Sequence, residues 1–165
     1  KYSSEHLLFN HLSNSFPFVE IVDLRDNMIA QGKRSKEFLC DDFLLLVKNL
    51  YCSGLLIVSI IKIQHVISGI SFIFNQKNTY YFWIDLFDER PMINLYHNTL
   101  FIKKITEDSS AVFNFGRGEY NYKIQNLEIL SSKLSSPISC NFQITAAIIG
   151  FPAEKIKNFF LFSNS

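Results

Sequence analysis

Residues 79–115 decide the fold of this chain, and they read TYYFWIDLF, DERP, MINLYHNTLFIKKIT, EDSS and AVFNF. The first and last segments are apolar runs typical of buried strands. Between them apolar residues recur at helical spacing after Pro91, which suits a helix entrance because its missing N–H costs nothing there. Strand, helix, strand is a βαβ unit, so the two strands are expected to be parallel and joined by a right-handed crossover. The expected buried face of the helix consists of Met92, Leu95, Tyr96, Thr99, Ile102 and Ile105.

Two further apolar runs, residues 55–63 and 66–74, precede the strand at 79–87. The polar segments that separate these three runs are very short. Connections of this length join only antiparallel neighbours. The sequence therefore predicts a three-stranded antiparallel meander that leads into the βαβ unit.

The stretch Leu55–Phe74 is about as long as a bilayer is thick, so a membrane span is the alternative interpretation. Lys62, Gln64 and His65 lie at its centre, where their burial in lipid would cost several kcal/mol in total. Its Val and Ile content also favours strands. We therefore predict a buried β-hairpin and no transmembrane segment.

The N-terminal part of the chain has weaker patterns. Residues 3–14 carry leucines at roughly helical spacing, residues 16–24 alternate weakly like a strand, and residues 26–34 read as a polar loop. From Ser35 an amphipathic helix is expected, with Ser35 as its cap and acidic residues in its first half. The whole pattern predicts an α+β domain with a mixed, mostly antiparallel central sheet, helices on both faces and one parallel βαβ crossover. The apolar face of the helix after Ser35 consists of Leu39, Phe43, Leu46, Val47 and Leu50.

Beyond residue 115 the chain turns at Gly116-Arg117-Gly118 and then carries several charged and phenolic side chains. Ligands of open α/β sheets collect where strands end, so a polar cluster just past a strand is a candidate floor for a site. A solvated loop with an ordinary glycine turn is the alternative, and the spacing leaves both open. The cluster consists of Arg117, Glu119, Tyr120, Tyr122 and Lys123.

Residues 113–123 resemble the signature of the cellulose-biosynthesis acetyltransferase domain of CelD/BcsL-like proteins, members of the GNAT superfamily. In this family a strand ending in Asp-Phe and an Arg-Gly-Asp/Glu corner are followed shortly by Tyr-Lys. Asn114 stands where the family usually has Asp, and residues 90–95 lack the superfamily's glycine-rich loop. The resemblance implies a single GNAT-like domain over residues 1–165. Because the chain does not begin with Met, the domain is expected either to stand alone or to be the C-terminal part of a longer protein.

The resemblance implies an acyltransferase that moves an acyl group, in the first place acetyl, from acyl-CoA to an amine or hydroxyl. The family suggests a sugar or a polysaccharide precursor as acceptor, and acyl-CoA is the only co-substrate expected. Two alternatives stay open. One is an aminoacyl transferase like the FemABX peptidoglycan ligases, and the other is a binding module with the same fold and no catalysis.

The same resemblance assigns roles to individual residues. Glu119 is the candidate base, Tyr122 or Tyr120 the candidate proton donor to the leaving sulfur, and Asp85 either a rival base or a strand-end acid that faces solvent. The pantetheine arm is expected between strands 79–87 and 111–115, and the pyrophosphate at the start of the crossover helix. Cofactor contacts are thus expected from Arg90, Met92, Ile93, Asn94, Asn114 and Phe115, and substrate contacts from Arg117, Lys123, Tyr81 and Trp83.

Composition narrows the remaining classes of partner. A formal net charge of +1 does not give the basic surface expected of a nucleic-acid binder. Three cysteines without CxxC spacing fit reduced thiols in a cytoplasmic protein better than a disulfide frame or a zinc site. The four histidines show no metal-ligand spacing, so no metal is predicted, and His97 is expected to pack or cap in the crossover helix rather than to titrate. Monomer and homodimer both remain open.

Overall fold

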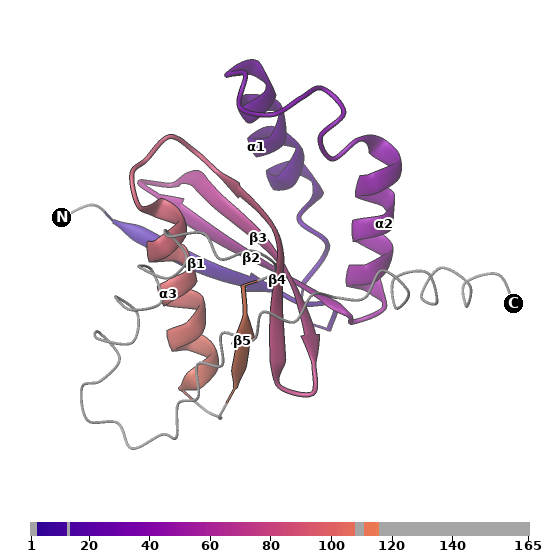
Figure 1. The fold of residues 1–165 in the computed structure, drawn as a ribbon, viewed down its shortest axis with the longest axis vertical. Coiled ribbons are helices and arrows are strands. Elements are labelled where there is room, and N and C mark those ends of the chain that lie inside the picture. Colours follow the sequence, from indigo (N-terminus) through magenta and orange to yellow (C-terminus); the bar gives the residue numbers. More distant parts are fainter. Residues whose placement is uncertain (1–2, 13, 108–110, 116–165) are drawn as a thin grey trace, which may run out of the picture.

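A computed structural model describes residues 3–12, 14–107 and 111–115 of the chain, and Figure 1 shows how its helices and strands are arranged. The predictions for residues 116–165, which include the Gly-Arg-Gly corner, lie outside the described residues. In chain order the elements are β1 (Ser4–Phe9), α1 (Phe18–Ala30), α2 (Asp41–Cys52), β2 (Leu56–Ile63), β3 (Val66–Gln76), β4 (Thr79–Phe87), α3 (Ile93–Thr106) and β5 (Val112–Asn114).

The five strands form one sheet in the order β1-β2-β3-β4-β5. β1, β2, β3 and β4 pair with their neighbours in antiparallel fashion, whereas β5 pairs with β4 in parallel. The predicted meander and the parallel βαβ unit are both confirmed. The fold class is therefore the predicted GNAT-like α+β class, with a mostly antiparallel sheet and one parallel crossover.

Helices cover both faces of this sheet, as predicted (Figure 1). On one face α1 and α2 pack against β2 and β3 through a cluster that includes Leu24, Val47, Val58 and Phe72. On the other face α3 packs through a second cluster that includes Phe101. Because both faces are covered, most side chains of the central strands are buried, and the strands read as nearly continuous apolar runs.

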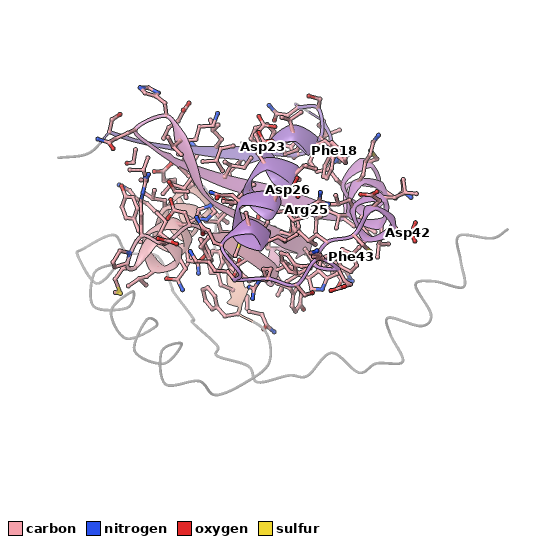
Figure 2. The ribbon with its side chains drawn as sticks, turned by 90° about the horizontal axis from the view of Figure 1, so that it is seen from above. Phe18, Asp23, Arg25, Asp26, Asp42 and Phe43 are labelled. Atoms are coloured by element: carbon pink, nitrogen blue, oxygen red, sulfur yellow. The ribbon has the colours of Figure 1, made fainter. Side chains whose placement is uncertain are left out.

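Arg25 connects α1 with the segment that leads into α2, and Figure 2 shows its position between the two helices. Its Nη1 donates a hydrogen bond of 2.9 Å to the backbone carbonyl of Leu39, and its Nε donates one of 2.8 Å to Asp26. Asp41 lies 3.9 Å from the same guanidinium. Because Leu39 is itself buried, these contacts fix the turn between the helices over the sheet.

The structure overturns the predictions for the first 34 residues. Residues 4–9 form an edge strand and not a helix, because their backbone pairs with β2 more than fifty positions away. Residues 18–30 form α1 and not a strand followed by a loop. The helical spacing is present in Ile21, Leu24 and Met28, which are all buried, but it continues into the stretch whose polar residues indicated a loop.

The two later helices were predicted, but the first of them was placed too early and with a different buried face. Leu39 lies before α2, whose buried residues are Leu44, Val47 and Tyr51. α2 begins after Cys40, so Ser35 is not its cap, while Asp41 and Asp42 lie in its first turn as expected. In α3 the buried face is rotated from the predicted one, because Met92 and Tyr96 are exposed. The buried residues of α3 are Ile93, Leu95, His97, Phe101 and Ile102.

No helix in the described part of the chain is long and apolar enough to cross a membrane. The stretch whose length allowed a membrane span folds as the β2–β3 hairpin, as predicted.

Gly69 on β3 leaves space for the side chain of Phe87 on β4. A Cβ atom at this position would lie 2.7 Å from Cδ1 of Phe87 and 3.0 Å from Cγ2 of Ile61. We expect Gly69→Ala to lower the free energy of unfolding by roughly 1–3 kcal/mol, measured by urea titration, because overpacking forces neighbouring side chains to shift.

The double variant Gly69→Ala/Phe87→Leu supplies the control. Leu is smaller than Phe, so the Gly69→Ala change should cost clearly less when residue 87 is Leu. An equal cost in both backgrounds would show that contact with Phe87 is not the cause.

Candidate active site

Among the described residues, the parallel strands β4 and β5 pair at three positions. Thr79 lies opposite Val112, Tyr80 opposite Phe113 and Tyr81 opposite Asn114. β4 then continues to Phe87, and none of the described residues pairs with this further part of its outer edge. An open strand edge presents backbone N–H and C=O groups that an extended ligand can bind.

A β-bulge in β4 lies directly past the last of these pairs. Phe72 of β3 is opposite Ile84 and Ile73 is opposite Phe82, so Trp83 is the extra residue of β4. A bulge leaves one residue without its ladder partner and redirects the side chains that follow. At this point in the sheet it places an irregular backbone beside the open edge.

Tyr81, Trp83 and Asn114 lie on the face of the sheet that α1 and α2 cover. The ring of Trp83 packs against Phe43 of α2, with centroids 5.4 Å apart, and against Phe74, with centroids 5.0 Å apart. Trp83 is still 37% exposed, so its ring is only partly covered. Asn114 is buried. The structure therefore brings together three of the side chains for which the sequence predicted ligand contacts.

Phe115 lies on the opposite face, toward α3. Its ring stacks on that of Phe82, with centroids 4.6 Å apart and planes inclined by 17°. Phe113 packs in the same cluster, against Tyr80 and Phe101. These rings fill the space between α3 and the strands, so the end of the described β4–β5 pairing has an apolar floor on this face.

Asp85 is not on the same face as Tyr81 and Trp83. Strict alternation would have put residues 81, 83 and 85 together, but the bulge reverses the alternation, and Asp85 lies opposite Ser71 on the α3 face. Its side chain is only partly exposed. The face on which Asp85 lies could not be predicted from the sequence, because a bulge leaves no mark in the residue types.

The segment after β4 leads into α3 with Arg90 held in a fixed position. Its Nε lies 3.2 Å from Oδ2 of Asp88, and its Nη1 donates a hydrogen bond of 3.4 Å to the carbonyl of Ile63. Met92 has φ 62°, the left-handed conformation, and precedes the first residue of α3. Ile93 is buried, so only its backbone can reach a ligand.

The N-terminus of α3 has no side-chain hydrogen bond at its cap position. Asn94 accepts a hydrogen bond of 2.7 Å from the N–H of Leu95, which leaves its amide NH₂ directed elsewhere. The N–H of Ile93 also donates a hydrogen bond of 3.4 Å to the carbonyl of Arg90, so the helix dipole is the main feature that makes this terminus favourable for an anion. Arg90, Met92, Ile93 and Asn94 are thus brought together at one end of the open β4 edge, as expected from the sequence.

Four of the predicted site residues, Glu119, Tyr122, Arg117 and Lys123, lie outside the described residues, as does Tyr120. Their roles stay predictions. In the described part of the chain no group of three or more His, Cys, Asp or Glu side chains is placed to hold a metal ion.

Sequence analysis missed a polar cluster under α3, formed by His6 of β1, Ser59 of β2 and His97 of α3. The Ser59 hydroxyl lies 2.8 Å from Nε2 of His6 and 2.7 Å from Nε2 of His97. Ser59 and His97 are almost completely buried. A serine this close to a histidine matches the geometry of a nucleophile and its base, but a buried hydroxyl under a helix has no access to a substrate.

Burial keeps both imidazoles neutral. Loss of solvation, with a smaller contribution from neighbouring His6, lowers the pKa of His97 from 6.5 to about 3. Loss of solvation and the charge of Lys104 lower the pKa of His6 to about 4. Below about pH 6.5 the histidines of the unfolded chain take up protons, whereas those of the folded chain do not. The free energy of unfolding is therefore unaffected by these two groups above about pH 6.5, and it falls as the pH is lowered toward their pKa values in the folded chain.

The sequence signal for this cluster was weak. His97 was expected to pack in the helix, which is confirmed, but its partners come from two strands and nothing in the spacing links them. Each of the three elements also contains other polar residues, so none of the three side chains was marked by its own segment.

No protein-family model matches this chain, and no curated protein matches its sequence. Among solved structures, a possible acetyltransferase from Clostridium difficile 630 is similar, with a TM-score of 0.51 and 12% identity over 86% of this chain and 94% of that chain. An aminoglycoside acetyltransferase from an uncultured soil metagenomic sample, solved with sisomicin, has a TM-score of 0.49 and 14% identity over 90% of this chain and 97% of that chain. At 12% identity, the similarity to the possible acetyltransferase shows a shared fold alone. That fold agrees with the GNAT-like topology described above.

The Ser59 hydroxyl is expected to stabilise the fold through its two histidine contacts. We expect Ser59→Ala to lower the free energy of unfolding at pH 7.5 by about 2 kcal/mol, because both imidazoles then lose a buried hydrogen-bond partner. Chemical denaturation monitored by circular dichroism measures this change.

Ser71→Ala is the matched control. Ser71 is equally buried, lies opposite Ser59 on the next strand, and its hydroxyl has no partner in the described part of the chain. Its replacement should therefore be neutral or slightly stabilising. Equal losses for the two variants would contradict a specific role for the Ser59 hydroxyl.

Proposed function

We propose that this chain is an acyl-CoA-dependent acyltransferase that transfers an acyl group, in the first place acetyl, to an amine or hydroxyl. The observation that carries the proposal is the parallel β4–β5 pair, whose last pair among the described residues, Tyr81 and Asn114, lies beside a bulge in β4, the strand that leads into the N-terminus of α3. Its occurrence in a fold shared with a possible acetyltransferase supports this assignment.

The proposed path of the donor follows the open edge of β4. The amide groups of a pantetheine arm would pair with the backbone of residues 82–87, as an added strand would. The pyrophosphate would then lie at the N-terminus of α3, with the Arg90 guanidinium close by. The usual glycine is missing there, but Met92 adopts the left-handed conformation that glycine normally provides.

The proposed reaction needs three groups around the thioester carbonyl. A base takes a proton from the acceptor, the acceptor attacks the carbonyl carbon, and a donor stabilises the negative charge on the oxygen. The carbon–sulfur bond then breaks and the thiolate takes up a proton. We assign Glu119 as the base and Tyr122 as the proton donor, and we propose that a backbone N–H near Trp83 stabilises the oxyanion, since a bulge leaves backbone groups unpaired.

The proposed acceptor is a sugar or a polysaccharide precursor that approaches from the face covered by α1 and α2. Tyr81 and Trp83 lie on that face, and the partly exposed Trp83 ring is held in place by Phe43 and Phe74. Ligand sites commonly combine aromatic walls with a few polar groups, and an aromatic ring suits the apolar face of a sugar. Arg117 and Lys123 are proposed to hold anionic groups of the acceptor.

Thermal unfolding with acetyl-CoA tests the donor class. A ligand that binds only the folded chain stabilises it by roughly 2.7 kcal/mol at a hundredfold excess over its dissociation constant, so the midpoint should rise. Free CoA and adenosine are the comparison ligands. A rise with acetyl-CoA and CoA but not with adenosine supports the proposal.

The absence of a rise at millimolar acetyl-CoA would contradict the proposed donor. A rise without release of free CoA in the presence of sugar and amine acceptors would instead favour the alternative of a binding module without catalysis, for which Asn114 and the missing glycine loop are the sequence arguments.

The identity of the base is tested by two matched carboxylate variants. We expect Glu119→Gln to lower kcat/KM about a hundredfold or more, the usual effect of losing a general base. Asp85→Asn should lower it less than about tenfold, because Asp85 lies on the face away from Tyr81 and Trp83. Release of CoA at several pH values measures both, and the reverse ranking would assign the role to Asp85.

A further inference from the structure

The Ser59 hydroxyl has one hydrogen and two imidazole neighbours. It can donate to one ring only, so it must accept a hydrogen bond from the other. Nδ1 of His97 is buried and has no partner in the part of the chain that the structure describes. A buried N–H without a partner is rarer than an unfilled acceptor, so His97 is best assigned as the donor to Ser59, and Ser59 as the donor to His6.

This arrangement tolerates little protonation. If both imidazoles were charged, the Ser59 hydroxyl would face two donors and its own hydrogen would have no acceptor. The two rings also lie close, with centroids 5.4 Å apart, so two positive charges would repel. His97 is 1% exposed, and a charge there would lose nearly all of its hydration.

The cluster also fixes one part of α3. His97 lies one turn after Ile93, at the start of the helix, and its ring reaches β2 through Ser59 and contacts Phe87 of β4. A second contact, between the hydroxyls of Ser4 and Tyr96 at 2.8 Å, joins the same turn to β1. Apolar packing has little directional preference, whereas these hydrogen bonds set where the helix starts along the sheet.

We propose that the His6–Ser59–His97 cluster is a pH-sensitive latch that holds the first turns of α3 on the sheet and releases them when an imidazole is protonated. Release would move the helix terminus that we assign to the pyrophosphate. The consequence for CoA binding therefore rests on the proposed function, whereas the latch itself does not.

Of the other ionisable groups around the cluster, some oppose protonation of its histidines and others favour it. Lys104 on α3 opposes a positive charge on His6. Asp85 faces the helix from β4, where a carboxylate would favour a positive charge, but it lies two strands away from Ser59. Ser71 on β3 and Tyr96 on α3 carry no charge near neutral pH. Burial therefore remains the main cost of protonation.

Backbone amide exchange of the full chain tests the latch. Peptides from α3 and from the β2–β3 hairpin are compared at pH 7 and pH 5, with rates corrected for the intrinsic pH dependence. Protonation at a released histidine with a pKa near 6.5 should raise the opening equilibrium of α3 roughly 20-fold, while the hairpin changes much less. Equal changes in α3 and the hairpin would overturn the proposal, since they would indicate global unfolding.

Two variants separate the latch from general stability. In His6→Gln/His97→Gln the side chains still form hydrogen bonds but do not titrate, so α3 should lose its extra response to acid. If the double change loosens α3 already at pH 7, the single variants His6→Gln and His97→Gln are compared instead, and each should lose part of the extra response to acid. Ser71→Ala should respond like the wild type. A non-titrating variant with the same pH response as the wild type would also overturn the proposal.

CoA binding gives the second readout. The affinity for CoA is measured for the wild type and for the non-titrating variant at pH 7 and at pH 5. The ratio of the wild-type affinity to the variant affinity should be at least several-fold lower at pH 5 than at pH 7. The comparison at each pH removes the titration of the CoA phosphate itself. Absence of CoA binding at pH 7 would contradict the proposed function, and amide exchange alone would then decide whether the latch exists. Equal affinities for both proteins at pH 5 would disprove the effect on binding.

Discussion

Burial of β2 and β3 on both faces is the constraint on which the rest of the structure depends. Most of their side chains are apolar and buried, so neither face can remain in water. α1 and α2 cover one face, and α3 covers the other. Because α3 has to return the chain to the sheet after covering its face, β5 must run parallel to β4. The parallel direction of β5 is thus a consequence of how the core is closed.

Sequence reasoning was successful where local signals and tertiary contacts agree. The runs at residues 55–63, 66–74 and 79–87 are strongly apolar and separated by short turns, so the meander was predictable. The first residues show the opposite case. Leu7 and Leu8 fit a helical spacing, but β1 exists because β2 offers a free edge, and no local pattern records that pairing.

The candidate site was predictable in outline and not in its geometry. Tyr81 and Asn114 were assigned from their strands, and they form the last β4–β5 pair among the described residues. The faces were not predictable, since the bulge at Trp83 moves Asp85 to the α3 side. The buried cluster was missed because His6, Ser59 and His97 come from three elements, and none of them stands out in its own segment.

The edge strand β1 has a consequence for how the chain behaves when shortened. β2 is an eight-residue strand, LIVSIIKI, whose outer backbone edge is paired by residues 4–9. Without these few residues, a long apolar edge with a single charge would face water and offer itself to the same strand of another molecule. The N-terminal residues thus protect the domain against aggregation, and shortened versions that begin after Phe9 are poor starting points for expression.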